Sequence, residues 1–324
     1  MPQTLFAPPT ARVVQVGVST GLFERLARGG PQRPADLADA LGLQRTGTRL
    51  LCECLAAMGH LRVRRDGRYR LSRRARRWLD PASPHAVTQF VAHTATYWPW
   101  WEQLEALVRD GSHVELHDAP AEDPSWERYI RGQHELARLS APEVAKALDV
   151  PAGARTVLDV AGAHGWFAAA LCDRHPGLRA TVLDLPGSAA VGRTIMRETG
   201  HADRVTHVDG SAFDADLGGP HDLALVFNLV HHLGPEAIVT LLRRVHGALA
   251  PGGSVAVLDL FARPRGAAPG GEAFLGLFFH LTSGSDVYTD SELRGFLAAA
   301  GFGPARAVGL TRLPAQTLYV APRA

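Results

Sequence analysis

The distribution of hydrophobic residues along the chain changes near Arg155. Beyond it, short apolar runs typical of buried strands alternate with segments in which apolar residues recur at helical spacing. The expected strands are 155–160, 179–184, 204–208, 222–228, 254–260, 303–310 and 315–321, and the expected helices are about 164–174, 187–198, 235–249 and 289–300. This alternation predicts an α/β fold, a doubly wound, Rossmann-like parallel sheet with helices on both faces. Only Leu310–Pro314 joins the last two strands, too short a segment for a crossover helix, so an antiparallel hairpin is expected there.

The N-terminal part of the chain has helical spacing followed by strand spacing. Residues 9–28 are apolar on most sides of the expected helix, which predicts burial or an interface. Two further helices are expected, one over 33–41 and one that Thr46 caps. Apolar and polar residues then alternate over 61–71 around an Asp-Gly pair, a strong hairpin signal. Three helices and a hairpin predict a winged-helix domain over residues 1–80.

Arginines crowd the expected hairpin and the residues that follow it, at positions 62, 64, 65, 68, 70, 73, 74, 76 and 77. This density would suit contacts with DNA phosphates. The alternative is a solvated polar face, because the arginines alternate with residues that are expected to be buried. The helix that would enter a DNA groove offers only Gln44, Arg45 and Arg49 to read bases. Nucleic acid is therefore not the expected partner.

Residues 81–150 are expected to form a helical linker between the two domains. Its most aromatic stretch is 97–101, which either packs between domains or lines the pocket of an aromatic substrate. A long helix is expected from Ser125 to about Leu148, after an Asp-Pro pair.

The stretch from Val157 to Phe167 carries the first sign of a ligand. An apolar strand is followed by a turn of small residues, Ala161–Gly165, and then by an apolar helix. Such a turn brings backbone N–H groups and a helix N-terminus up to a bound group. Asp184 ends the next strand, where an acid can bind the hydroxyls of a ribose. The pattern predicts a nucleoside-type cofactor bound by residues 151–324; the alternative is that the glycines only turn the chain.

The composition of the chain is that of a globular protein and points to no particular binding partner. The chain has 324 residues, of which 46% are hydrophobic, and a formal net charge of +2. Cys52, Cys54 and Cys172 give neither a disulfide framework nor a metal-ligand spacing, so no metal is expected. We see no signal peptide at the N-terminus and no apolar run of 18 residues, so a cytoplasmic protein without a membrane span is expected.

Five motifs together resemble the class I S-adenosylmethionine-dependent methyltransferases, and more narrowly the caffeate and hydroxyindole O-methyltransferase family with its bacterial secondary-metabolite branch. They are VLDVAGAHG from Val157, VLDLP from Val182, VDGSAFD from Val208, FNLVHHLGPE from Phe227 and LAPGGSVAVLD from Leu249. Their order and spacing are more specific than any one of them, and the resemblance covers essentially the whole chain. It implies an N-terminal dimerisation domain, a homodimer, S-adenosyl-L-methionine as cofactor and a phenol-like or polyketide-like small molecule as substrate.

The resemblance also implies roles for individual residues. The turn after Val160 would hold the methionine end of the cofactor, and Asp184 would take its ribose hydroxyls. The full implied cofactor set is Asp159, Ala161, Gly162, Gly165, Asp184, Leu185, Ser211, Ala212, Phe213 and Asn228. His231 would be the general base, oriented by Asp259 where the family usually has Glu.

The residues support this catalytic assignment independently. His231 follows an expected strand, so it should lie at the carboxyl edge where open sheets bind ligands. An imidazole has a pKa near neutrality, as removal of a proton from a hydroxyl requires. The alternatives are a polar helix start for His231 and His232, and a solvated acid at a strand end for Asp259. His232 stands where plant relatives carry Asp.

The substrate positions carried over from the resemblance are mostly apolar and aromatic, as a flat ring requires. They are Trp98, Trp101, Ile130, His134, Phe274, Leu277, Phe278 and Thr282. Core packing is an equally good use for Leu277 alone.

Three departures from the family pattern leave other chemistry open. The turn reads AGAHG rather than GGGTG, which adds two methyl groups; Ser211 replaces an Asp; and the second acid beside the base falls at Val287, next to Asp286. The alternatives are N- or C-methylation, or a hydroxylation, decarboxylation or rearrangement on the same fold and cofactor. A winged-helix DNA-binding regulator with a ligand-sensing sheet is a further alternative.

Overall fold

The computed structural model describes residues 2–263, 268, 270–311, 313 and 316–324 and divides the chain into two compact units. The first unit comprises the chain up to Trp98 together with Arg131–Leu136, and the second comprises Pro99–Ile130 and Ala137–Ala324. The domain boundaries expected near residues 80 and 150 stay a prediction. No helix in the described part of the chain is both long and apolar enough to cross a membrane.

The first unit begins with two helices where the sequence predicts one. They are α1 (Pro2–Ser19) and α2 (Leu22–Gly29). Gly21 between them has φ +73°, a left-handed conformation that glycine adopts readily and that ends a right-handed helix. The prediction of one helix over 9–28 is therefore wrong.

The next two helices lie where the pattern predicts them. α3 (Pro34–Leu41) ends at Gly42, which has φ +65°. α4 (Arg45–Ala57) begins one residue before the expected cap. The side chain of Gln44 accepts a hydrogen bond from the Gly47 N–H group, so the expectation that Thr46 caps this helix is wrong.

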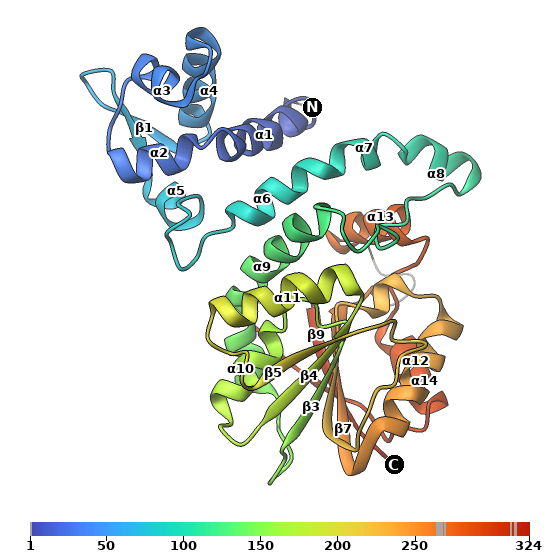
Figure 1. Ribbon diagram of the computed structural model, residues 1–324. Coiled ribbons are helices and arrows are strands. Elements are labelled where there is room, and N and C mark those ends of the chain that lie inside the picture. The colour runs from blue at the N-terminus through green and yellow to red at the C-terminus, as the bar shows by residue number, and fades with distance from the viewer. Residues whose placement is uncertain (1, 264–267, 269, 312, 314–315) are drawn as a thin grey trace. The chain divides into compact units, whose positions relative to one another are not determined.

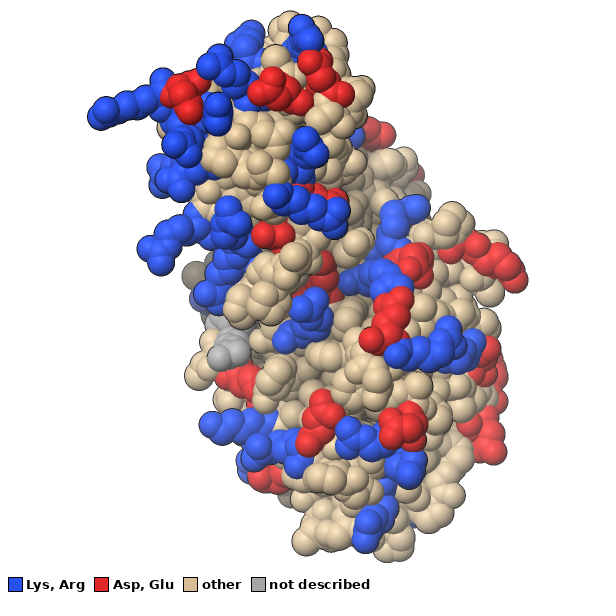
Figure 2. All heavy atoms as spheres, turned by 60° about the vertical axis from the view of Figure 1, so that its left-hand side comes forward, with Lys and Arg blue, Asp and Glu red and all other residues tan. Residues whose placement is uncertain are grey.

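The predicted hairpin is present as β1 (Leu61–Val63) and β2 (Tyr69–Leu71), which pair antiparallel. The unit continues with α5 (Arg73–Trp78), α6 (Thr88–Thr94) and the short 3₁₀ helix η1 (Ala95–Tyr97). All nine arginines of the hairpin and α5 are exposed, and Figure 2 shows basic side chains gathered at the upper part of the view. The winged-helix identity of this unit stays a prediction.

The second unit is built on a seven-stranded sheet with the order β5-β4-β3-β6-β7-β9-β8 (Figure 1). The strands are β3 (Thr156–Val160), β4 (Arg179–Asp184), β5 (Val205–Asp209), β6 (His221–Phe227), β7 (Leu249–Leu260), β8 (Arg306–Val308) and β9 (Gln316–Pro322). β9 pairs antiparallel with both β7 and β8, which confirms the predicted C-terminal hairpin. The remaining neighbours are parallel.

Two strand predictions need correction. β7 starts at Leu249 rather than at 254, because Leu249 already pairs with His221 of β6 across a register shift. The strand expected over 303–310 is only Arg306–Val308, because this edge strand pairs with β9 alone over those residues.

Helices cover both faces of the sheet, as predicted for a doubly wound fold. α9 (Ser125–Ala147), α10 (Trp166–Arg174) and α11 (Pro186–Glu198) pack on one face, and α12 (Pro235–Ala248) and α14 (Asp290–Ala299) on the other. Successive strand residues alternate between the two cores, so Val157 packs on the first face and Leu158 on the second. The other helices are α7 (Trp98–Trp101), α8 (Leu104–Asp110), η2 (Val230–His232) and α13 (Glu272–Ser283).

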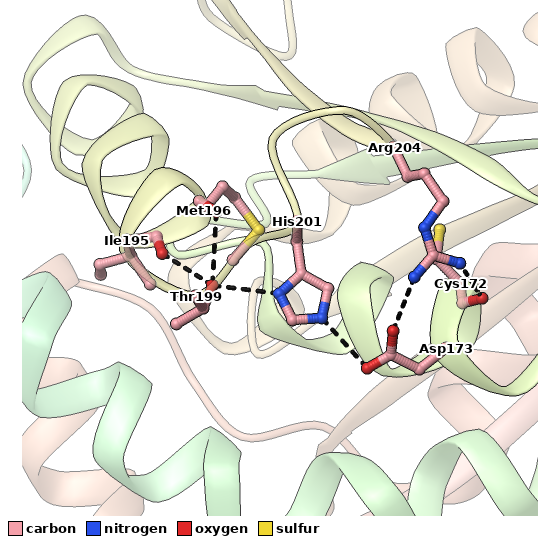
Figure 3. Close-up of polar contacts among 7 residues, drawn as sticks. All are labelled: Cys172, Asp173, Ile195, Met196, Thr199, His201 and Arg204. Carbon is pink, nitrogen blue, oxygen red and sulfur yellow. Dashed lines mark hydrogen bonds and ion pairs between the residues drawn. The ribbon is translucent and has the colours of Figure 1, made fainter.

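A polar network fastens α10 to the segment that leads into β5 (Figure 3). The carboxylate of Asp173 lies 3.1 Å from Nε2 of His201 and 2.7 Å from Nη2 of Arg204. Arg204 also donates to the carbonyl of Cys172, and the His201 ring packs edge-on against Trp166 at 5.3 Å. Because Trp166 is the first residue of α10, this network holds the helix that follows the glycine turn.

Candidate active site

The turn between β3 and α10 has an unusual backbone. Ala161 and Ala163 have φ of +54° and +48°, a left-handed conformation that disfavours residues with a Cβ atom. The Ala161 N–H group donates to the carbonyl of Leu183 on the neighbouring strand, at 2.7 Å. Gly165, with φ +69°, then starts α10. The turn thus keeps the geometry of a glycine loop although two of its residues are alanine.

The backbone of Gly162 approaches the carboxyl group of Asp159 closely. A Cβ atom at residue 162 would stand 2.3 Å from Cγ of Asp159, so only glycine fits. Asp159 is 1% exposed, and its Oδ2 has no hydrogen-bond partner among the described residues. Burial, and secondarily the charge of Asp184, raise the pKa of this carboxyl to about 8. A buried and unsatisfied acid at a ligand-binding turn is suited to a cationic group.

Asp184 closes the other side of the turn at the end of β4. Its Oδ2 accepts a hydrogen bond from the Ala163 N–H group and its Oδ1 accepts one from Leu185, both at 2.7 Å. Burial raises the pKa of Asp184 to about 6, and these hydrogen bonds oppose the rise. The two acids therefore flank one small-residue turn in the unit's interior.

A pocket of about 290 Å³ opens beside this turn. Its walls are formed by Glu115, His117, Trp126, Tyr129, Ile130, Ala161, Ala163, Leu183, Asp184, Leu185, Ser188, Gly210, Ser211, Ala212, Phe213, Asn228, Leu229, His232, Leu233 and Ser283. Seven of the residues predicted to bind the cofactor line it: Ala161, Asp184, Leu185, Ser211, Ala212, Phe213 and Asn228. Ile130 is the predicted substrate residue among its walls.

His231 and Asp259 are brought together at the carboxyl edge of the sheet. His231 lies in η2 after β6, and Asp259 lies near the end of β7. The two side chains are hydrogen-bonded, with 2.5 Å between Nδ1 and Oδ1, and both are buried. Phe279 stacks on the imidazole with ring centroids 3.7 Å apart. His231 is therefore held on one edge and covered on one face, and it is His232 that lines the pocket.

His232 and His117 are pocket residues whose contacts the sequence does not reveal. Nδ1 of His232 lies 2.6 Å from Oγ of Ser283, which leaves Nε2 for the pocket. The ring of His117 meets that of His232 edge-to-face at 4.7 Å and lies 3.4 Å from the hydroxyl of Tyr129. His117 comes from the segment between α8 and α9, and no periodicity or motif marks it.

The other predicted substrate residues are not among the residues that line the pocket. Trp98 and His134 belong to the first unit. Trp101 contacts the ring of Phe278 at 5.6 Å. Phe274 is 75% exposed, Leu277 is half-buried, and Thr282 is buried with its hydroxyl donating to the carbonyl of Phe278. No group of three or more His, Cys, Asp or Glu side chains among the described residues is arranged to hold a metal ion.

Comparisons with known proteins find similar sequences and structures. A family profile described as the O-methyltransferase domain matches residues 101–303, and one described as the O-methyltransferase dimerisation domain matches residues 9–81. Acetylserotonin O-methyltransferase of Mus musculus is 31% identical over 91% of this chain and 81% of its own. Mitomycin biosynthesis 6-O-methyltransferase of Streptomyces lavendulae is 30% identical over 93% of this chain and 91% of its own. The solved structure of mitomycin 7-O-methyltransferase superposes with a TM-score of 0.85 at 28% identity, covering 100% of this chain and 96% of that one.

Proposed function

The chain belongs to the O-methyltransferase family, and we propose that it uses S-adenosyl-L-methionine to methylate a hydroxyl group of an aromatic or polyketide-like small molecule in secondary metabolism. The observation that carries the proposal is the hydrogen bond between His231 and Asp259 at the sheet edge where ligands of open α/β sheets bind. The similarity to enzymes of acetylserotonin and mitomycin methylation supports the same class of acceptor.

The residues around the glycine turn fit this cofactor. Asp159 and Asp184 are buried, and burial raises the pKa of both carboxyls, so an ordered cation beside them would favour their ionised forms. Asp184 is suited to the ribose hydroxyls, and Ser211, Ala212 and Phe213 line the same pocket, where they would flank the adenine ring. When bound, S-adenosyl-L-methionine supplies the methyl group and a sulfonium leaving group.

His231 is suited to be the general base. An ionised carboxylate only accepts hydrogen bonds. Asp259 therefore accepts one from the Nδ1–H group of His231, and Nε2 is the unprotonated nitrogen of the neutral ring. Nε2 can then accept the proton of an acceptor hydroxyl as the methyl group is transferred. Asp259 orients the ring and stabilises the imidazolium that results.

The test is methyl transfer from labelled S-adenosyl-L-methionine to a panel of phenols, followed by NMR to identify the methylated atom. His231→Ala should lower turnover by about 10²–10⁴-fold, the usual contribution of a general base, with cofactor affinity nearly unchanged. The matched control His232→Ala removes the adjacent imidazole and should keep most activity on a phenol that has no second polar group. An inactive His232→Ala beside an active His231→Ala would show that the base is His232 and not His231. Normal transfer by both variants would show that the acceptor needs no base, and methylation at carbon or nitrogen would replace the proposed reaction.

We further infer that the protein is a homodimer. Val13, Val14, Val16 and Val18 of α1 are only half-buried in the single chain, although such apolar side chains favour burial. They lie within the match to the dimerisation domain. Sedimentation should give twice the monomer mass, and a stable full-length monomer would refute the inference.

A further inference from the structure

The charged side chains that line the pocket in the described part of the chain are all acidic. Among the lining residues that the structure describes, Glu115 and Asp184 can carry negative charge, whereas neither Lys nor Arg is present. The remaining titratable side chains that could carry positive charge are the imidazoles of His117 and His232. Whether these two rings are protonated therefore decides what kind of polar group the pocket can accept.

The contacts of the two rings favour their neutral forms. His232 touches both His117 and His231, with ring centroids 4.7 and 4.1 Å apart, so a proton on one ring opposes a proton on the next. Burial, and then repulsion from the protonated form of His231, lower the pKa of His117 to about 4 and that of His232 well below its ordinary value. The nearby carboxylates of Glu115 and Asp118 oppose this effect on His117 without overcoming it.

The segment that carries His117 is held in place before any ligand binds. The N–H groups of Val114 and Leu116 donate to the carbonyls of Leu281 and Thr282 at the end of α13, at 2.7 and 3.2 Å. Nε1–H of Trp126 donates to the carbonyl of Pro120 on the other side of His117, at 3.0 Å. Anchors on both sides make His117 a fixed wall of the pocket rather than a mobile loop residue.

Resting on the methyltransferase function proposed above, we propose that His117 and His232 form a neutral two-imidazole subsite that selects acceptors whose second polar group is uncharged, such as a carboxamide, ketone or hydroxyl, and rejects the corresponding carboxylates. A neutral imidazole offers one donor and one acceptor, which match an uncharged polar group. A carboxylate would lose its water without gaining a Lys or Arg partner and would face the negative charge of Glu115.

The test uses two probes of the same shape, 3-hydroxy-2-naphthamide and 3-hydroxy-2-naphthoate. Their affinities for the full-length protein saturated with S-adenosyl-L-homocysteine are compared by calorimetry at pH 7. The amide should bind at least about tenfold more tightly than the carboxylate, because burying an unpaired charge in such a site costs more than about 1.4 kcal/mol of binding free energy. Equal affinities, tighter binding of the carboxylate, or failure of the amide to bind would each overturn the proposal.

Variants locate the preference. His117→Arg places a cation in the subsite and should bring the affinity ratio to one or invert it, whereas His117→Gln keeps an uncharged donor and acceptor and should preserve it. The matched control is Val108→Arg on α8, which adds a cation at a residue that is 75% exposed and outside the pocket walls, and it should leave the ratio unchanged. A His117→Arg protein that melts normally and still prefers the amide would overturn the proposal; if it does not fold, loss of the preference in His117→Gln would do so.

The two proposals fail separately. Methyl transfer to each probe is measured with the same protein after S-adenosyl-L-methionine replaces S-adenosyl-L-homocysteine. A preference for the amide, with no methyl transfer to it or to any phenol of the panel, would overturn the methyltransferase function and keep the subsite. Transfer at equal efficiency to both probes would do the reverse.

Discussion

Nδ1 of His231 and Oδ1 of Asp259 lie 2.5 Å apart, although 28 residues separate them in the chain. Oδ1 of Asp259 also accepts the N–H of Leu260, and Oδ2 lies 3.3 Å from the N–H of His231. The carboxylate is therefore held by backbone groups on both sides and in turn holds the imidazole. This arrangement specifies which nitrogen of His231 carries the proton.

The first prediction concerns this carboxylate. Asp259→Asn should lower the kcat of methyl transfer by about 10–10²-fold, because an amide no longer stabilises the imidazolium and can favour the wrong tautomer. The affinity for S-adenosyl-L-methionine, measured by calorimetry, should stay unchanged. The control Asp259→Glu keeps the charge and should retain more activity than Asp259→Asn. Equal loss in both variants would mean that the site needs the shape of Asp259 and not its charge.

The sheet and the His231–Asp259 pair could be predicted from the sequence for the same physical reason. Strands buried on both faces are continuous apolar runs, and β4 begins and ends at the predicted residues. In a parallel sheet the carboxyl ends of neighbouring strands meet at one edge, so residues that follow β6 and end β7 come together. The positions of His231 and Asp259 at the ends of neighbouring strands therefore predict their contact as well as their roles.

What the sequence could not give depends on packing between segments. His117 lies in a stretch without periodicity and reaches the pocket because backbone hydrogen bonds tie its neighbours to α13. The side chains expected to line the site from α13 itself depend on the rotation of that helix, and Phe274 turns outward while Thr282 is buried. The break at Gly21 depends on a single φ angle within an apolar run.

The second prediction concerns cofactor affinity and pH. Asp184→Ala should weaken S-adenosyl-L-methionine binding at least about tenfold, because a carboxylate bonded to two hydroxyls contributes more than a neutral pair. In the wild type, the pKa of Asp184 is raised to about 6, so its ionised form is lost as the pH falls through that value. Affinity measured by calorimetry should therefore decline from pH 7.5 to pH 5, and this decline should shrink in Asp184→Ala. An unchanged affinity in the variant would remove Asp184 from the site.

The third prediction concerns the strained turn. Ala163 adopts φ +48°, at an expense of about 1–2 kcal/mol for a residue with a Cβ atom. Ala163→Gly should therefore leave the free energy of unfolding unchanged or raise it by up to about 1 kcal/mol, after the greater entropy of the unfolded chain is deducted. It should also leave cofactor binding intact. Chemical denaturation measures the first effect and calorimetry the second.

The matched opposite change lies one residue earlier. Gly162→Ala would place a methyl group 2.3 Å from the buried carboxyl of Asp159, which cannot move into solvent. This variant should be less stable than wild type and should bind the cofactor weakly. If Ala163→Gly were the more damaging of the two, the turn would not have the conformation described.

The last prediction concerns the hairpin of the first unit. Arg62 and Arg70 are directly opposite each other in the antiparallel pair of β1 and β2, and both are exposed. Like charges in such positions are destabilising, whereas opposite charges contribute about 0.2–1 kcal/mol. Arg70→Glu should therefore raise the melting temperature of this unit at low ionic strength, and the gain should fade in 1 M salt, where charges more than about 3 Å apart are screened. The control Arg49→Glu breaks the ion pair with Glu53 in the same unit and should shift melting in the opposite direction. A melting temperature of Arg70→Glu at or below that of wild type would mean that the arginines of the hairpin are already neutralised by a bound anion or a partner chain.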